Sequence, residues 1–207
     1  MSQQSMIDRY TSGELILHWV TALTFLLLAA SGLAFFHPSM FWLTGLLGGG
    51  TWARILHPFI GVVMFVAFIL MAVKFWHHNV LSGNDRKWLG QINDVIANRD
   101  GRMPPIGRYN PGQKILFWVL LASMIVLLVS GVTIWQPYFA PSFGIGTIRF
   151  GALMHALGAL ALILLIIVHI YSSFWVKGST EGMLSGKVSR SWAKAHHPQW
   201  YEEATRK

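Results

Sequence analysis

Two histidines, His155 and His169, lie fourteen residues apart within one apolar stretch of residues 151–176. An α-helix turns by about 100° and rises by about 1.5 Å per residue, so the second imidazole lies within roughly 40° of the first and about 21 Å further along the axis. Polar side chains in a membrane-spanning helix usually have a functional role. One helical face therefore presents two stacked imidazoles that could ligate metal centres.

Two further histidines, His18 and His57, lie in other apolar stretches. Their depths predict an outer pair, His57 with His155, and an inner pair, His18 with His169. Two imidazoles from different helices could hold a haem b between them, and an iron with both axial positions filled is suited to electron transfer. A lone buried histidine is more often a satisfied polar residue or part of a proton path, but four that pair in depth favour haem. His37, at the predicted outer boundary, is a weaker substitute for His57.

The surroundings of the outer pair can be interpreted in two ways. Gly61, Gly151 and Gly158 share helical faces with the two histidines, where they could admit a porphyrin or simply allow close helix packing. Arg54 and Arg149 could pair with haem propionates, or could extend toward the membrane surface as interfacial cations do.

The composition requires a membrane environment for these histidines. The chain has 207 residues, of which 54% are hydrophobic and 12% charged, against about 25% charged in soluble domains. Four stretches approach or exceed the roughly 20 residues that a span needs, namely residues 15–36, 53–75, 114–135 and 151–176. We therefore predict an all-α integral membrane four-helix bundle in residues 1–176, followed by a basic tail in residues 177–207. The chain has no cysteine, which excludes disulfides, cysteine-ligated iron–sulfur clusters and thioether-attached haem within it.

The net charge of +8 predicts a topology. Only Arg54 and Arg149 would lie on the outer face. The other cations flank the inner ends of the spans, in the lead, the loop of residues 77–111 or the tail: Arg9, Lys74, Arg86, Lys87, Arg99, Arg102, Arg108, Lys114, Lys177, Lys187, Arg190, Lys194, Arg206 and Lys207. The positive-inside rule then places both termini and this loop in the cytoplasm of a multi-pass protein. Acidic residues share the same face, which disfavours nucleic acid as a partner.

An amide cluster precedes the third span at the predicted cytoplasmic edge. Asn110 and Gln113, with Gly112 between them, could offer hydrogen-bond donors to the carbonyls of a quinone. Asn110 and Pro111 are also residues that commonly begin and cap a helix. Both interpretations stay open from the residues alone.

The chain closely resembles the cytochrome b (gamma) subunit of bacterial respiratory formate dehydrogenase. The resemblance extends nearly end to end, over the four histidines and the segments Arg54-Ile55-Leu56-His57-Pro58, Arg108-Tyr109-Asn110-Pro111-Gly112-Gln113-Lys114, Gln136-Pro137-Tyr138-Phe139-Ala140 and His196-His197-Pro198-Gln199-Trp200-Tyr201. One departure is Gln136, where many relatives have arginine before the proline.

The resemblance implies a membrane anchor in the bacterial inner membrane for a formate:quinone oxidoreductase of anaerobic respiration. Its partners would be an iron–sulfur beta subunit and a molybdopterin-containing alpha subunit on the periplasmic side, assembled as a trimer of heterotrimers. Electrons would pass through the outer and inner haems to menaquinone or ubiquinone. The quinone site would comprise Asn110, Gly112 and Gln113, with the haem ligand His169 nearby. The chain would not itself oxidise formate.

Two alternatives remain from the sequence. The chain could be the dihaem cytochrome b subunit of a nickel–iron hydrogenase or thiosulfate reductase, because the residues do not identify the electron donor. A histidine-lined metal transporter belongs to another class of protein. It predicts carboxylates within the spans, where Glu14 at one edge is the nearest candidate.

Overall fold

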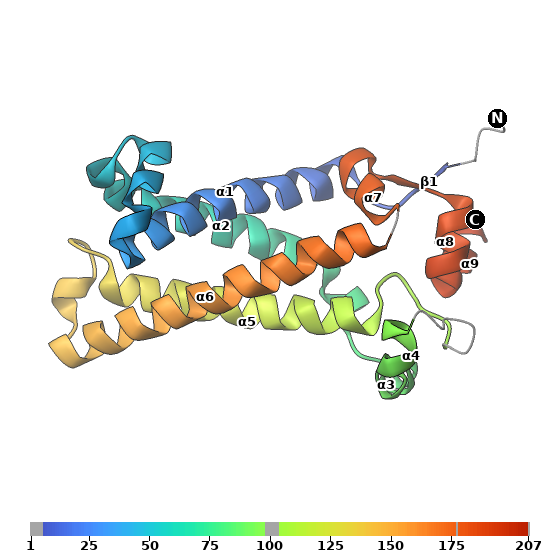
Figure 1. Cartoon of the computed structure of the whole chain (residues 1–207). Helices are drawn as coiled ribbons and strands as arrows, with labels where there is room; N and C mark the ends of the chain where they lie inside the picture. Colours follow the sequence, from blue (N-terminus) through green and yellow to red (C-terminus); the bar gives the residue numbers. More distant parts are fainter. Residues whose placement is uncertain (1–5, 98–103, 177, 207) are drawn as a thin grey trace. The chain divides into compact units, whose positions relative to one another are not determined.

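Four long helices dominate the computed structural model, which describes residues 6–97, 104–176 and 178–206. They are α1 (Ser12–Phe36), α2 (Gly50–Phe75), α5 (Pro111–Ile134) and α6 (Ile145–Trp175) (Figure 1). Each is long and apolar enough to cross a membrane, which confirms the predicted all-α membrane architecture. Arg99, Arg102, Lys177 and Lys207 of the charge argument lie outside the described residues.

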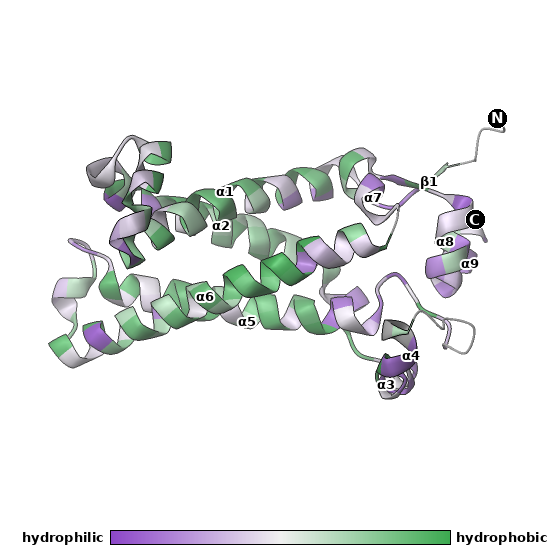
Figure 2. Ribbon diagram, viewed as in Figure 1, coloured by the Kyte–Doolittle hydropathy of each residue, from purple (hydrophilic) through white to green (hydrophobic). Residues whose placement is uncertain are grey.

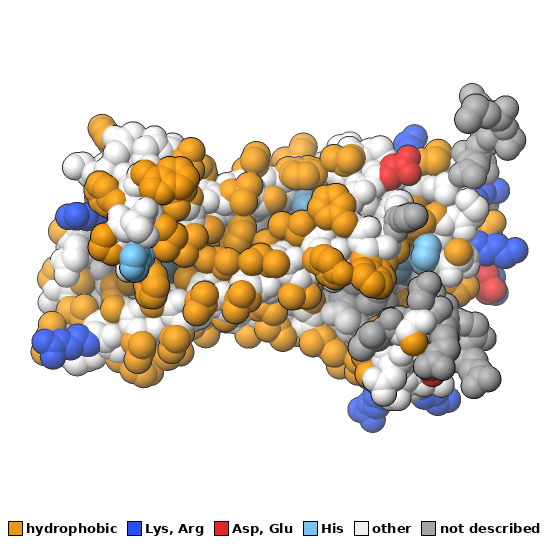
Figure 3. Space-filling view, in the orientation of Figure 1, with side chains coloured by type: hydrophobic (Ala, Val, Ile, Leu, Met, Phe, Trp, Pro, Cys, Tyr) orange, Lys and Arg blue, Asp and Glu red, His pale blue; other side chains and the backbone are white. Residues whose placement is uncertain are grey.

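The apolar surface of these helices faces outward. Between 11% and 22% of the residues in each apolar stretch are buried within the protein. Hydrophobic residues cover the long helices in Figure 2, and on the face drawn in Figure 3 hydrophobic side chains gather over the same segments. Exposed apolar surface of this extent needs a hydrocarbon environment.

Each long helix begins earlier than predicted, by three residues for the first three and by six for the fourth. Capping explains two of these starts. Thr11 and Glu14 bond each other's backbone N–H groups at the start of α1, and Asn110 and Gln113 do the same at the start of α5. Such reciprocal caps satisfy donors that lack partners within the helix, so polar residues extend both helices beyond their apolar stretches.

The chain divides into two compact units, which we describe separately. One unit contains residues 16–73 and 120–170, the central and distal parts of the four long helices. Small side chains are prominent in its interior, including the buried Ala34, Ala53, Ala67 and Ala72. Small residues let membrane helices approach closely. This unit also contains two 3-10 helices, η1 (Pro38–Leu47) and η4 (Ala140–Ser142).

The other unit contains residues 1–15, 74–119 and 171–207, and therefore both ends of the described chain. Strand β1 (Met6–Asp8) pairs antiparallel with β2 (Lys187–Ser189), with Ile7 opposite Val188. Helices α7 (Ser179–Ser185), α8 (Arg190–His196) and α9 (Pro198–Thr205) complete the tail. Val188, Ala193 and Trp200 form its hydrophobic core. The segment predicted only as a basic tail is thus folded together with the amino-terminal lead.

The loop between α2 and α5 also belongs to this second unit. It contains η2 (Trp76–Asn79), α3 (Gly83–Gly90) and α4 (Ile92–Ile96). Lys114 Nζ, at the start of α5, donates to Asp85 Oδ2 at 2.8 Å and to the Val80 carbonyl at 3.1 Å. Trp118 Nε1 donates to the Asn79 carbonyl at 2.9 Å. These bonds attach the loop to the first turns of α5.

Candidate functional site

The structure brings the four predicted histidines together in two pairs. His57 of α2 faces His155 of α6, with 6.3 Å between ring centroids and 66° between ring planes. His18 of α1 faces His169 of α6, at 6.4 Å and 49°. Both pairs lie within the unit of residues 16–73 and 120–170. Helix α6 thus supplies one imidazole to each pair.

The separation within each pair matches what one metal ion between two imidazoles requires. A metal–nitrogen bond of about 2.0 Å, added to the roughly 1 Å from a ring nitrogen to its centroid, places two axial rings about 6 Å apart. Axial imidazoles can rotate about the axis they share, so the two interplanar angles are both compatible with this arrangement. Among the described residues no group of three or more His, Asp or Glu side chains could hold a metal ion, so the candidate ligands come in pairs.

Serine hydroxyls fix the ring orientation of the His57–His155 pair. Ser31 Oγ of α1 lies 2.7 Å from His57 Nδ1, and Ser130 Oγ of α5 lies 3.1 Å from His155 Nδ1. Each hydroxyl has one hydrogen, and each lies against the carbonyl four residues earlier in its own helix, at 2.8 Å for Ser31 and 2.6 Å for Ser130. With the hydroxyl hydrogen directed to that carbonyl, the oxygen is free to accept from Nδ1–H. In this tautomer Nε2 of both rings is unprotonated and would be the nitrogen available to a metal.

Glycines follow both serines, and Gly131 is the one whose missing side chain makes room for an imidazole. A Cβ at Gly32 would lie 3.8 Å from His57 Cε1, and one at Gly131 would lie 3.3 Å from His155 Cε1. The glycines singled out from sequence divide between their two interpretations. Gly61 faces open space among the described residues, as a porphyrin would need, whereas Gly151 and Gly158 pack against side chains of α5.

The His18–His169 pair has a different environment. Nδ1 of His18 is buried and has no hydrogen-bond partner among the described residues. The ring lies edge-on to Trp19, with centroids 5.3 Å apart. Its tautomer is therefore not fixed in the way that Ser31 fixes that of His57.

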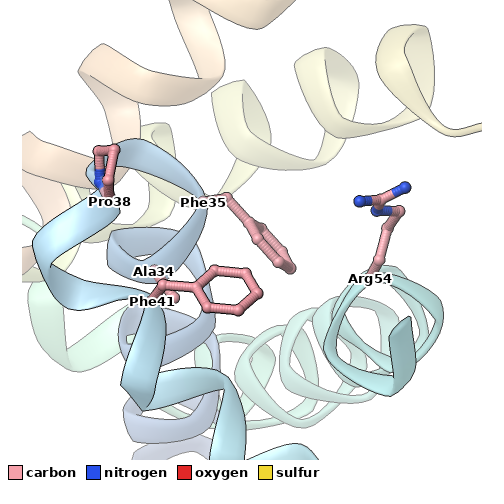
Figure 4. A pocket seen from close by; sticks show the side chains of 5 residues that line it. All are labelled: Ala34, Phe35, Pro38, Phe41 and Arg54. Carbon is pink, nitrogen blue, oxygen red and sulfur yellow. The ribbon is translucent and has the colours of Figure 1, made fainter. Parts of the chain in front are cut away.

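A pocket opens beside His57, lined by Ala34, Phe35, Pro38, Phe41 and Arg54 (Figure 4). The Phe35 ring packs edge-on against the His57 ring at 5.7 Å between centroids. Arg54, three residues before His57 on α2, supplies the positive charge in the lining. The exposed Arg149 is absent from that lining.

The predicted amide cluster forms the amino-terminal cap of α5. Asn110 Oδ1 accepts from the Gln113 N–H at 2.8 Å, and Gln113 Oε1 accepts from the Asn110 N–H at 2.9 Å. A Cβ at Gly112 would lie 3.3 Å from Asn110 Oδ1, so glycine leaves space for the cap. Both carboxamide oxygens are engaged, and the NH2 group of each amide is the part suited to donating to a quinone carbonyl. Capping and quinone binding are therefore compatible.

The remaining histidines have other roles. His37 caps η1 and accepts from the Ser39 N–H at 3.3 Å. The ring centroids of His77 and His78 lie 4.0 Å apart in η2, which follows α2. His197 is buried in the folded tail, where Arg9 Nη2 lies 3.3 Å from its Nε2. Burial and then the Arg9 charge lower the pKa of His197 to about 3, against the opposing effect of its bond to the Gly107 carbonyl.

Sequence reasoning missed Ser31, Gly32, Ser130 and Gly131. A signal was present, because the dipeptide Ser-Gly occurs in both α1 and α5. Small residues in an apolar stretch, however, suggest a signal-peptide cleavage region or helix packing as readily as a ligand site.

Four apolar helices that carry histidine pairs at this spacing have the arrangement expected of a membrane cytochrome of the b type. The chain belongs to the prokaryotic cytochrome b561 family, whose model matches residues 9–186. It is 49% identical over 203 residues to the cytochrome b556(fdo) subunit of formate dehydrogenase from Escherichia coli K12, covering 98% of this chain and 95% of that one. The nitrate-inducible cytochrome b556(Fdn) subunit of the same organism is 45% identical, with coverage of 98% and 94%. The formate dehydrogenase cytochrome b556 subunit of Haemophilus influenzae is 41% identical, with coverage of 98% and 85%. The comparisons confirm the predicted resemblance.

Proposed function

We propose that this chain is the membrane-anchoring cytochrome b subunit of a formate dehydrogenase, and that it carries electrons through two b haems to a quinone. The proposal rests on the two histidine pairs. In each pair the ring centroids lie about 6 Å apart, and one of the two histidines belongs to α6. The relatives at 41% to 49% identity, all named as formate dehydrogenase subunits, support the choice of complex.

The four histidines would act as axial ligands. A haem b bound to two imidazoles supplies reversible one-electron chemistry and has no open iron position. His155 and His169, fourteen residues apart on α6, set an axial step of about 21 Å between the two sites. Arg54, in the pocket beside His57, is the residue we assign to a propionate.

We place both termini on the cytoplasmic side of the inner membrane. The unit that contains both chain ends also contains cations such as Arg9, Arg108 and Lys187, and the positive-inside rule supports its cytoplasmic location. The iron–sulfur and molybdopterin subunits would then dock on the opposite, periplasmic side. In this orientation the amides of Asn110 and Gln113 lie at the cytoplasmic edge, where a quinone could draw protons from the cytoplasm.

The test is the haem content of the purified chain and of two single variants. We expect dithionite to produce b-type bands and extraction to yield two haems per chain. His155→Ala should lose one haem, while the control His37→Ala, which removes a histidine that caps η1, should keep both. One haem or none in the folded wild-type chain would refute the proposal.

The electron donor is tested in the intact complex. Formate should reduce the haem bands. Hydrogen should not reduce them, and thiosulfate should not reoxidise haems that have been reduced with dithionite. If formate fails while hydrogen reduces the haems or thiosulfate reoxidises them, the cytochrome role stands and the complex is the corresponding hydrogenase or thiosulfate reductase.

A further inference from the structure

We propose that Ser31 and Ser130 are positioning residues that lower the reduction potential of the haem held by His57 and His155, relative to that held by His18 and His169. The inference rests on the proposed function, since it concerns a haem at each pair. It attributes a difference in reduction potential between the two haems to two side chains that do not ligate iron.

The first step is the state of the two hydroxyls. Ser31 is 1% exposed and Ser130 is 5% exposed, so water does not compete for their bonds. Each hydroxyl lies within hydrogen-bond distance of a carbonyl of its own helix and of an imidazole Nδ1, and we assign the hydroxyl hydrogen to the carbonyl and the Nδ1 hydrogen to the serine oxygen. Both bonds join a helix that carries no ligand of this pair to a helix that carries one.

The second step is that the same Ser-Gly arrangement occurs beside both histidines. Ser31 and Gly32 on α1 meet His57 of α2, and Ser130 and Gly131 on α5 meet His155 of α6. In both places the serine lies against Nδ1 and the following glycine lies beside Cε1, where a Cβ would be tight at Gly131 (3.3 Å) and an ordinary contact at Gly32 (3.8 Å). Each ring of this pair thus has a serine on its Nδ1, and His155 has in addition a backbone hydrogen bond with Leu127.

The third step is the contrast with His18 of the second pair. His18 Nδ1 is buried without a hydrogen-bond partner among the described residues. A ligand whose distal N–H is hydrogen-bonded is more basic and donates more electron density to its metal. Stronger donation stabilises the oxidised iron, so the serines bias the His57–His155 site toward the lower potential. Electrons would then move downhill from this site to the His18–His169 site.

The experiment is a redox titration of the intact complex, followed optically and by electron paramagnetic resonance of the oxidised form. The variants are Ser31→Ala, Ser130→Ala and the double change. Thr24→Ala is the matched control, because the Thr24 hydroxyl also donates to a carbonyl of α1, that of Val20. Ser31→Thr retains a hydroxyl and serves as the rescue. The transition that disappears in His155→Ala identifies the site being measured.

Each serine removal should raise the potential of that one transition. The loss of one hydrogen bond corresponds to about a two- to tenfold change in the ratio of oxidised to reduced haem, and tenfold equals about 59 mV for a one-electron couple. The double change should shift the transition further, and the resonance signal of the same haem should move with it. Thr24→Ala and Ser31→Thr should leave both transitions in place.

Two results would overturn the inference: an unmoved transition in Ser31→Ala and Ser130→Ala at full haem content, or an equal shift of both transitions. Loss of the haem in Ser31→Ala with retention in Ser31→Thr would support it, since the hydroxyl would then be shown to hold the ligand. Failure of the proposed function can be distinguished from failure of this inference. In the first case the wild-type complex would show fewer than two b-type transitions, before any serine is changed.

Discussion

Asn110 and Gln113 accept hydrogen bonds from each other's backbone N–H groups at 2.8 and 2.9 Å, and so form a closed cap at the start of α5. The cap uses the oxygen of each carboxamide, whereas a quinone carbonyl would need the nitrogen. The two roles can therefore be separated by substitution.

Asn110→Asp and Gln113→Glu keep the capping oxygens and remove the NH2 donors. Aspartate caps helices as well as asparagine does, and glutamate serves at the third helical position, so we expect thermal stability to change little. If the amides bind quinone, haem oxidation by added quinone should slow by about tenfold or more, as for the loss of a hydrogen bond worth about 1.4 kcal/mol. Unchanged rates in both variants would leave the residues with a capping role only.

Gly131 controls the space available to His155. Its missing Cβ would lie 3.3 Å from His155 Cε1, closer than ordinary van der Waals contact, so a side chain there must displace the ring. We expect the haem content of the His57–His155 site to fall from wild type to Gly131→Ala and further to Gly131→Val. Gly146→Ala on α6, where a Cβ meets no described atom within 4 Å, is the control. Full occupancy in Gly131→Val would argue against an iron ligated by His155 in this position.

His197 makes the folded tail sensitive to acid. Its pKa is lowered to about 3 in the folded protein, by burial and then by Arg9, against about 6.5 when unfolded. The unfolded chain therefore binds more protons between these values. The stability contribution is present above pH 6.5 and is lost as the pH falls toward 3, by up to about 1.4 kcal/mol per pH unit.

Hydrogen exchange at the Ile7 and Val188 amides measures this loss, after correction for the intrinsic pH dependence of exchange. Protection should fall between pH 6.5 and 5 in the wild type, and His197→Gln should flatten the slope. His196→Gln changes the exposed neighbour and should retain the slope. Identical slopes in all three proteins would assign the effect to other groups.

The ion pair between Lys114 and Asp85 should show strong coupling. Both residues are buried, at 9% and 6% exposed, and the Nζ–Oδ2 distance is 2.8 Å. Burial alone would raise the pKa of Asp85, but the bonds from Lys114 and Ser82 outweigh it and hold that pKa below its usual value. Removing one partner of a buried pair costs about 3–5 kcal/mol, because the other charge is left uncompensated.

A double-mutant cycle tests this coupling. Lys114→Met and Asp85→Leu should each increase proteolysis in the loop that contains α3, and the double variant should be less destabilised than the sum of the two. Strict additivity would show that the two charges act independently.

The sequence predicted what depends on local composition. Apolar length gave four spans, and the positions of histidines within them gave two candidate pairs at plausible depths. The starts of α1 and α5 were misplaced because Glu14, Asn110 and Gln113 are polar, and the predicted spans were bounded by apolar residues. Ser31 and Ser130 were missed because their importance depends on which helices are neighbours, which no periodicity encodes. The three-residue strands β1 and β2 are too short to show alternation and exist only through their pairing with each other.

The pairing of β1 with β2 joins the segment before the first long helix to the segment after the last. Backbone pairing requires both strands to be on the same side of the bilayer, so it forms only after an even number of helices has been inserted. During synthesis Ile7 has no strand partner until Val188, 181 residues later in the sequence, has been made. The strand pair is thus among the last long-range contacts to close, and an incompletely inserted chain leaves its amino-terminal lead unpaired and open to proteolysis.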